Sequence, residues 1–220
     1  MDFSKEIVYV NGPGAQSYMT MFKEAGFGST SDPDKASIIV YTGGADVNPA
    51  LYGEKNFEIA GRGVSYFDDK RDERDAVMFG IGCANQILHV GICRGGQFLN
   101  VMNEGSMWQH VNGHAGVGEH ELVDTVTDEV HMVTSTHHQM MRPGAGGQVL
   151  AVASKAGFKV AEHDSFDRKK AENFPKEWAE DVEVIWYPDT KCLCFQPHPE
   201  HPGADSTRKY FFSLLERILA

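Results

Sequence analysis

Residues 87–102 read Ile-Leu-His-Val-Gly-Ile-Cys-Arg-Gly-Gly-Gln-Phe-Leu-Asn-Val-Met. The mostly apolar run at 87–92 predicts a buried strand, and the apolar residues at 98, 99, 101 and 102 predict a helix. Between them lies Gly91-Ile92-Cys93-Arg94-Gly95, a G-x-C-x-G pattern in the strand–turn–helix context of a nucleophile elbow. We therefore expect Cys93 to stand on a sharp turn, at a helix N-terminus whose dipole favours a thiolate.

The alternation of strand and helix continues on both sides of this turn. Upstream, short apolar runs predict strands at 7–10 and 37–41, and apolar stripes predict helices over 18–25 and 72–85. Strands separated by helices are typical of an α/β fold with a mostly parallel sheet. A last amphipathic helix begins near Asp205 or Ser206. The second half is richer in candidate strands, some of which we expect to pair antiparallel: 121–125, 130–134, 148–153, 159–162, 182–187 and 192–196.

Length and charge limit the possible functions. The chain has 220 residues and a formal net charge of −11, which suits one globular domain over residues 1–220. An acidic chain with no Lys/Arg tract is not expected to bind nucleic acid. No apolar run approaches the roughly 20 residues of a membrane span, so we expect no membrane partner. No signal peptide is recognisable, and the four cysteines are expected to stay reduced in the cytoplasm.

A thiol nucleophile needs a base and an oxyanion site, and the sequence offers both. His198 follows a predicted strand, and Glu200, two residues on, can orient its imidazole. An oxyanion is stabilised by two backbone amides near the nucleophile. One would come from Arg94, directly after the cysteine, and the other from Gly43 or Gly44, at the end of an upstream strand.

The stretch 91–97, with Leu99-Asn100-Val101 after it, resembles the elbow of the class I glutamine amidotransferase superfamily. More narrowly, it resembles the γ-glutamyl hydrolase branch (the C26 peptidases), which includes the γ-glutamyl-γ-aminobutyrate hydrolases. The resemblance implies a flavodoxin-like three-layer α/β sandwich, with the nucleophile at the C-terminal end of a central strand. Four further stretches match that branch in order, between about residues 38 and 203: Thr42–Pro49 with Leu51–Gly53, Asp68 with Arg71-Asp72, Ser135–Gln139, and Phe195–Glu200.

The resemblance also implies a chemistry and a set of roles. The triad would be Cys93, His198 and Glu200, and no cofactor is implied. The reaction would be hydrolysis of a small-molecule γ-glutamyl amide through a thioester. A glutaminase subunit that delivers ammonia to a separate synthetase partner is the alternative, since amidotransferases share the triad. A non-catalytic module is disfavoured by the intact triad. The γ-glutamyl group would be held by Gln97, Ser135, Thr136, His137, His138 and Gln139.

Other features receive a structural interpretation. Cys192-x-Cys194 with His198 and His201 could bind zinc, but two small core residues in a buried strand are favoured. No metal is expected, and His110, His114 and His120 are interpreted as surface or loop residues, because no metal-binding spacing links them. Arg71 or Asp72 would brace the active-site loops. The charged stretch 163–181 is interpreted as a solvated excursion, with a lid or docking surface as the alternative.

Overall fold

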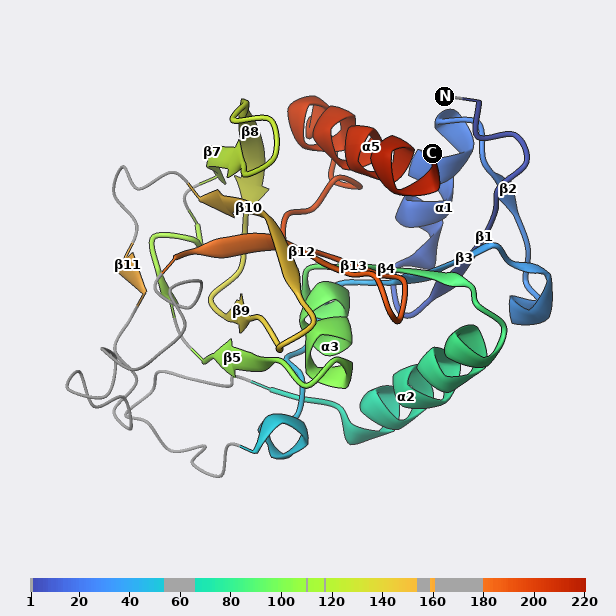
Figure 1. Ribbon diagram of the computed structural model, residues 1–220, viewed down its shortest axis with the longest axis horizontal. Helices are drawn as coiled ribbons and strands as arrows, with labels where there is room; N and C mark the ends of the chain where they lie inside the picture. Colours follow the sequence, from blue (N-terminus) through green and yellow to red (C-terminus); the bar gives the residue numbers. More distant parts are fainter. Residues whose placement is uncertain (1, 54–65, 110, 117, 154–158, 161–179) are drawn as a thin grey trace.

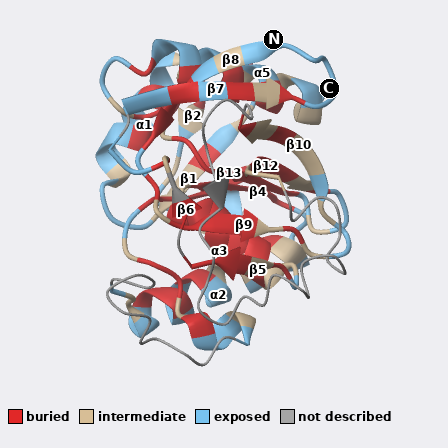
Figure 2. Ribbon diagram, turned by 90° about the vertical axis from the view of Figure 1, so that its left-hand side faces the viewer, coloured by how far each residue is buried: buried red, intermediate tan, exposed pale blue. Residues whose placement is uncertain are grey.

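The strand–turn–helix around Cys93 lies at the centre of the protein. The computed structural model describes residues 2–53, 66–109, 111–116, 118–153, 159–160 and 180–220. Strand β4 (Leu88–Ile92) is buried along its length and is followed at once by helix α3 (Arg94–Met102), as the sequence predicts. Figure 2 shows that α3 is buried as well, so the elbow is held between two rigid, enclosed elements.

The described strands include a nine-stranded mixed sheet with a parallel half and an antiparallel half. The parallel half runs in the order β2 (Gly28–Ser29), β1 (Ile7–Asn11), β3 (Ile38–Tyr41), β4 and β13 (Cys192–Phe195). The antiparallel half continues with β12 (Val182–Tyr187), β10 (Gln148–Ala153), β7 (Gly118–Asp124) and β8 (Val130–Ser135). Two short antiparallel pairs are separate: β5 (Ser106–Trp108) with β9 (Met140–Arg142), and β6 (Val111–Asn112) with β11 (Lys159–Val160).

Helices cover both faces of the sheet and make the predicted three-layer α/β sandwich (Figure 1). On one face, α1 (Ala15–Glu24) and α5 (Asp205–Leu219) share a core with the sheet. On the other face, α2 (Asp69–Ala84) and α3 pack on a second core. The all-apolar sequence of β3 follows from this arrangement, because a strand covered on both faces buries every side chain. Short 3₁₀ turns lie at η1 (Pro33–Lys35) and η2 (Pro49–Tyr52).

Three parallel neighbours bring the predicted site together. Strands β3, β4 and β13 are adjacent, with Tyr41 paired to Gly91 and Phe195 paired to Ile92. The loops after these strands therefore leave the same edge of the sheet, where open α/β sheets bind their ligands. These loops carry Gly43, Cys93 and His198, which are far apart in the sequence.

The longer elements are confirmed, with small shifts at their ends. Strand β7 begins at Gly118, three residues earlier than predicted, and α2 begins at Asp69 because Asp68 caps it by accepting from the Arg71 amide. The last helix starts at Asp205, but its N-cap is Ala204, which makes no side-chain cap. The very short β2, β5, β6 and β9 were not predicted. Residues 161–179, including most of the excursion at 163–181, lie outside the described residues. None of the described helices is long and apolar enough to cross a membrane.

Candidate active site

Cys93 occupies a strained turn between β4 and α3. Its backbone has φ 52° and ψ −115°, and positive φ is uncommon for a residue with a Cβ. A Cβ at Gly91 would overlap the backbone of Gly95, and a Cβ at Gly95 would overlap the carbonyl of Tyr41. The glycines of the G-x-C-x-G pattern are therefore required by the close approach of the strand, the turn and the helix. The turn holds the thiol at the N-terminus of α3.

His198 and Glu200 form the remainder of the predicted triad. The Nδ1 atom of His198 lies 2.6 Å from Oε1 of Glu200. Burial opposes the charge on His198, but Cys93 and Glu200 both attract it and hydrogen-bond to the ring, which together raises its pKa to about 10. Burial also opposes ionisation of Glu200, yet the pKa of this carboxyl is lowered because His198 interacts with it. His198 is therefore an imidazolium at neutral pH, poised between the sulfur and the carboxylate.

The loop after β3 lies against both Cys93 and His198. A Cβ at Gly43 would lie 2.8 Å from Cε1 of His198 and 3.6 Å from Cβ of Cys93, so only glycine fits between them. The Gly43 amide donates to Oη of Tyr18 at 2.9 Å and thus already has an acceptor. Gly44 has φ 131°, a conformation that glycine adopts freely. The sequence did not single out Tyr18, which appeared only as one apolar position of a helix.

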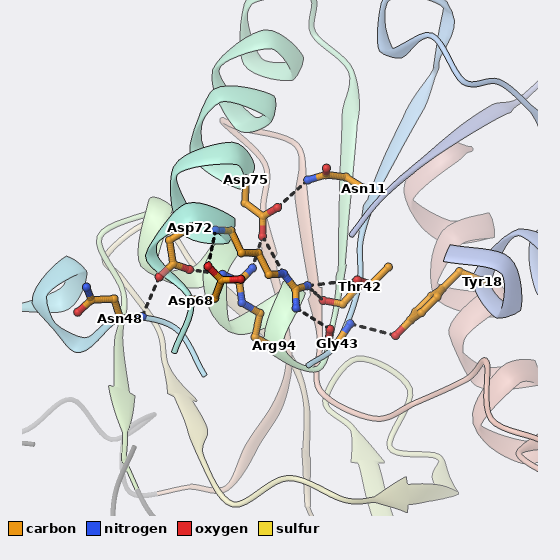
Figure 3. A network of polar contacts seen from close by, with 10 residues as sticks. Asn11, Tyr18, Thr42, Gly43, Asn48, Asp68, Asp72, Asp75 and Arg94 are labelled. Carbon is orange, nitrogen blue, oxygen red and sulfur yellow. Dashed lines mark hydrogen bonds and ion pairs between the residues drawn. The ribbon is translucent and has the colours of Figure 1, made fainter. Parts of the chain in front are cut away.

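A buried network of charges holds the glycine loop against α2 (Figure 3). Arg71 donates to the Gly43 carbonyl at 2.9 Å and to the Thr42 carbonyl at 2.6 Å. Arg94 forms ion pairs with both Asp72 and Asp75, all of them buried. The expectation that Arg71 or Asp72 braces the active-site loops is confirmed. The Arg94 side chain points into this network, so only its backbone amide remains for an oxyanion.

We predict that Arg71→Ala lowers Cys93-dependent activity by about 10²-fold, because displacement of a positioning loop by about 1 Å has effects of that size. The same variant should lose about 2–3 kcal/mol of unfolding free energy, since hydrogen bonds from a buried charge are removed. Steady-state kinetics and urea unfolding would measure both. Arg74→Ala is the matched control, because Arg74 is exposed on the same helix. Equal effects of the two variants would contradict the bracing role.

The residues expected to hold the γ-glutamyl group lie near one another, but their side chains have different partners. Gln97 is buried and donates to Oε1 of Gln196 at 3.1 Å and to the Gln139 carbonyl at 3.5 Å. Thr136 is exposed, whereas Oγ of Ser135 is buried and donates to the His114 carbonyl at 2.6 Å.

The two histidines of that segment point to different partners. Nε2 of His138 lies 3.2 Å from Oδ1 of Asp46, and this contact raises the pKa of the ring. Nε2 of His137 lies 3.4 Å from Oε1 of Glu183. His137 is thus engaged with a buried carboxylate outside the triad.

Two residues, Thr134 and His201, contact His198 in a supporting role that the sequence analysis did not assign to them. Oγ1 of Thr134 accepts from the His198 amide at 2.7 Å, and the Thr134 amide donates to Oγ1 of Thr207. His201 stacks on His198, with ring centroids 4.3 Å apart and planes inclined by 9°. Neither contact has a local sequence signal, because Thr134 is about sixty residues away and a histidine beside proline is common in loops.

The interpretation of His120 as a surface or loop residue is wrong, because it lies in strand β7. His114 does lie in a loop, but not at the surface. Both side chains are buried, and with Glu183 their ligand atoms lie within 4.8 Å of one another. A second convergent group, His198, Glu200 and His201, belongs to the triad. Cys192 and Cys194 are core residues of β13, and burial raises the pKa of both thiols, to about 12 for Cys192. His110 lies outside the described residues.

Comparisons with known proteins show which proteins this chain is similar to. A Mycobacterium tuberculosis protein that carries the name of a glutamine amidotransferase is 37% identical over 89 residues, which are 38% of this chain and 27% of that protein. The glutamine amidotransferase-like protein YvdE of Lactococcus lactis is 29% identical over 173 residues, 62% of this chain and 72% of that protein. The chain thus spans about a quarter of the first relative and less than three quarters of the second.

A solved structure and a family model extend the comparison. A Thermoplasma acidophilum protein described as one of the subunits of a GMP synthase superposes with a TM-score of 0.62 at 14% identity, covering 97% of this chain and 94% of that one. This likeness shows a shared fold. The Peptidase C26 family model matches residues 34–200, which include Gly43, Cys93 and His198. The chain belongs to the Peptidase C26 family of the class I glutamine amidotransferase-like superfamily.

Proposed function

We propose that the protein hydrolyses a γ-glutamyl amide through a γ-glutamyl thioester on Cys93. The observation that carries this proposal is the strained cysteine beside an imidazolium that a carboxylate orients. A γ-glutamyl group is the acyl group that the family resemblance implies. The substrate would enter where Gly43 leaves room beside Cys93 and His198.

In the first step, Sγ of Cys93 attacks the side-chain amide carbon. The developing oxyanion accepts from the Arg94 amide, at the start of α3, and from a glycine amide of the loop after β3. Because Gly43 donates to Tyr18, the substrate would either displace that hydroxyl or use Gly44. The C–N bond breaks as His198 gives its proton to the leaving amine, and a thioester remains.

In the second step, water attacks the thioester carbon and gives one proton to His198. The C–S bond breaks, glutamate leaves as its carboxylate with release of the other proton, and the thiolate–imidazolium pair is restored. Glu200 keeps the His198 ring in one orientation through both proton transfers.

The experiment is release of glutamate by the purified chain alone. The panel contains glutamine and several γ-glutamyl amines and peptides, and Cys93→Ala is the blank. Fast, Cys93-dependent turnover of one γ-glutamyl amine, with glutamine a poor substrate, supports the stand-alone hydrolase and identifies its leaving group. Absence of Cys93-dependent release from every substrate would contradict the proposal.

A partner-dependent glutaminase is the second candidate. Its support is the similarity in fold to a protein described as belonging to a GMP synthase, over nearly the whole of both chains. Such a glutaminase would show slow turnover of glutamine only, and would pass ammonia to a separate synthetase. A rise in glutamine turnover on addition of a co-purifying synthetase would favour this candidate over the first.

The raised pKa of His198 predicts a pH dependence. The imidazolium is present below about pH 10, so kcat/KM should fall as the pH rises through that value. Glu200→Gln removes one of the groups that raise this pKa, so the fall should move to lower pH. The stability that this ion pair gives is complete below about pH 6.5 and is lost as pH rises through the folded-state pKa. A pH profile of glutamate release would measure the shift.

Glu73→Gln is the matched control for this pH shift. Glu73 is exposed on α2, and its replacement should leave unchanged the pH at which kcat/KM falls on the alkaline side. A profile of Glu200→Gln that coincides with that of Glu73→Gln would show that Glu200 does not set the protonation of His198.

A further inference from the structure

Four buried side chains outside the triad converge on one point. They come from separate segments: His114 from the loop between β6 and β7, His120 from β7, His137 from the turn after β8, and Glu183 from β12. All four are at most 3% exposed. A buried carboxylate surrounded by imidazoles needs a source of positive charge, because burial of an uncompensated charge is costly.

The distances match the geometry of a metal site. Oε1 of Glu183 lies 3.3 Å from Nδ1 of His114, 3.3 Å from Nε2 of His120 and 3.4 Å from Nε2 of His137. Zinc binds His nitrogen and carboxylate oxygen at roughly 2.0–2.2 Å, and in a tetrahedral site the ligand atoms are then about 3.3–3.5 Å apart. The ligand atoms of His114, His120 and Glu183 also lie within 4.8 Å of one another, so these three suit ligands around a small cation. His137 lies within reach of Glu183 and would join them as the fourth ligand after a small shift of its ring.

The ring nitrogens that face away from Glu183 have acceptor partners, which fixes where the ring protons lie. Nε2 of His114 lies 3.2 Å from Oδ2 of Asp181, and Nδ1 of His137 lies 2.9 Å from the Gln139 carbonyl. Carboxylates and carbonyls only accept, so these outer nitrogens carry the protons. Against the effect of burial, Asp181 and Glu183 raise the pKa of His114 to about 9, so a metal ion would have to displace a proton from this ring. Once the rings are neutral, the nitrogens that face Glu183 are acceptors. Carboxylate–histidine and carbonyl–histidine contacts of this kind orient metal ligands in known sites.

Glu183 itself lacks the hydrogen bonds that its burial calls for. Among the described residues, neither of its oxygens accepts a well-aligned hydrogen bond. Acceptors on His114 and His137 thus face an acceptor on Glu183 at hydrogen-bonding distance. A divalent cation between them would neutralise the Glu183 carboxylate and coordinate the imidazole nitrogens that face it.

We propose that His114, His120, His137 and Glu183 bind one divalent transition-metal ion, with Zn²⁺ as the expected ion. The donor set of imidazole nitrogen and one carboxylate is typical of zinc sites. The site is separate from the thiol chemistry. The competing explanation is that extra protons on the histidines supply the positive charge, and the test below distinguishes the two.

The proposed metal site lies next to the Ser135–Gln139 segment, which is expected to hold the substrate, and would fix the position of that segment. The Gln196 amide, two residues before His198, donates to the Glu183 carbonyl at 2.9 Å. His137 and Gln97 both contact the Gln139 carbonyl. The metal would therefore hold the Ser135–Gln139 segment against the catalytic loops, as a structural ion rather than a reacting one.

The test is metal binding by the full chain, measured without reference to activity. The protein is stripped with a chelator and titrated with Zn²⁺, and separately with Co²⁺, whose visible absorption reports tetrahedral coordination. We expect about one equivalent of either ion, a rise in Tm with Zn²⁺, and imidazole nitrogens in the zinc X-ray absorption spectrum. Failure of the stripped, folded protein to take up either ion would overturn the proposal.

Variants assign the ion to these residues. His120→Ala and the nearly isosteric Glu183→Gln should lose the cobalt spectrum, whereas His131→Ala, in the neighbouring strand β8, should keep it. Cys93→Ser should also keep it, so the result does not depend on the proposed hydrolase activity. Circular dichroism checks that each variant is folded. If His120→Ala does not fold, the nearly isosteric Glu183→Gln still tests the site. Loss of the ion in His201→Ala but not in Glu183→Gln would place the metal at the triad and overturn the proposal.

Discussion

Cys93→Ala is expected to lower glutamate release by roughly 10⁴-fold or more, because removal of a nucleophile leaves only substrate binding and oxyanion stabilisation. The fold should be unaffected, since alanine keeps the Cβ and removes only the sulfur. Steady-state release of glutamate from the best γ-glutamyl amide would measure the loss. Cys83→Ala is the matched control, because Cys83 lies half-buried in α2 and away from the site, and it should retain activity. Activity in Cys93→Ala close to that of Cys83→Ala would place the nucleophile elsewhere.

Substitutions at Cys93 should also show that the turn at this residue is strained. A non-glycine residue in a sparsely populated backbone region costs of order 1–3 kcal/mol, and glycine would relieve that cost at φ 52°. Glycine also loses about 0.5–1 kcal/mol through unfolded-state entropy. Cys93→Gly should therefore be about 1 kcal/mol more stable than Cys93→Ala, although both variants are inactive. Urea unfolding of the pair measures the difference, and a less stable glycine variant would show that the turn is not strained.

The sequence predicted the elbow and the triad because their determinants are local. The glycines at 91 and 95 are required by contacts within a few residues of Cys93 or with the adjacent strand β3. The strands that precede Gly43 and His198 are short, fully apolar runs, so their parallel pairing with β4 follows from the α/β pattern. Three loops at one edge of the sheet could thus be anticipated from strand order alone.

The features that were missed depend on contacts between distant segments. Strands β5 and β9 have three residues each, and their pairing comes from tertiary packing rather than from periodicity. His114, His120 and Glu183 are brought together by the antiparallel half of the sheet, and their spacing in the sequence matches no known motif. Tyr18 is predicted only as an apolar position of a helix, whereas in the structure its hydroxyl accepts from the Gly43 amide at the site.

The buried network beneath the glycine loop is expected to be very sensitive to the loss of any one of its charges. Two arginines and two aspartates are buried there together, so their charges balance within the network. Burial raises the pKa of Asp72, and Arg94 is the main group that opposes this effect. A balanced group of buried charges adds little net stability, but removal of one member leaves an uncompensated charge in the interior.

Arg94→Ala is therefore expected to lower the free energy of unfolding by about 3–5 kcal/mol, since it leaves Asp72 and Asp75 with one arginine. The loss should be largest at neutral pH. Without Arg94 the pKa of Asp72 rises further, and protonation at lower pH removes the buried charge, so the variant should recover relative to the wild type as pH falls. The double variant Arg94→Ala/Asp72→Asn should regain stability at neutral pH, because the second substitution also removes the buried negative charge of Asp72. Urea unfolding between neutral and mildly acidic pH, with the exposed Arg74→Ala as control, measures all three results. A loss that is independent of pH, and that Asp72→Asn does not reduce, would show that Arg94 acts through packing against Phe98 rather than by neutralising the two carboxylates.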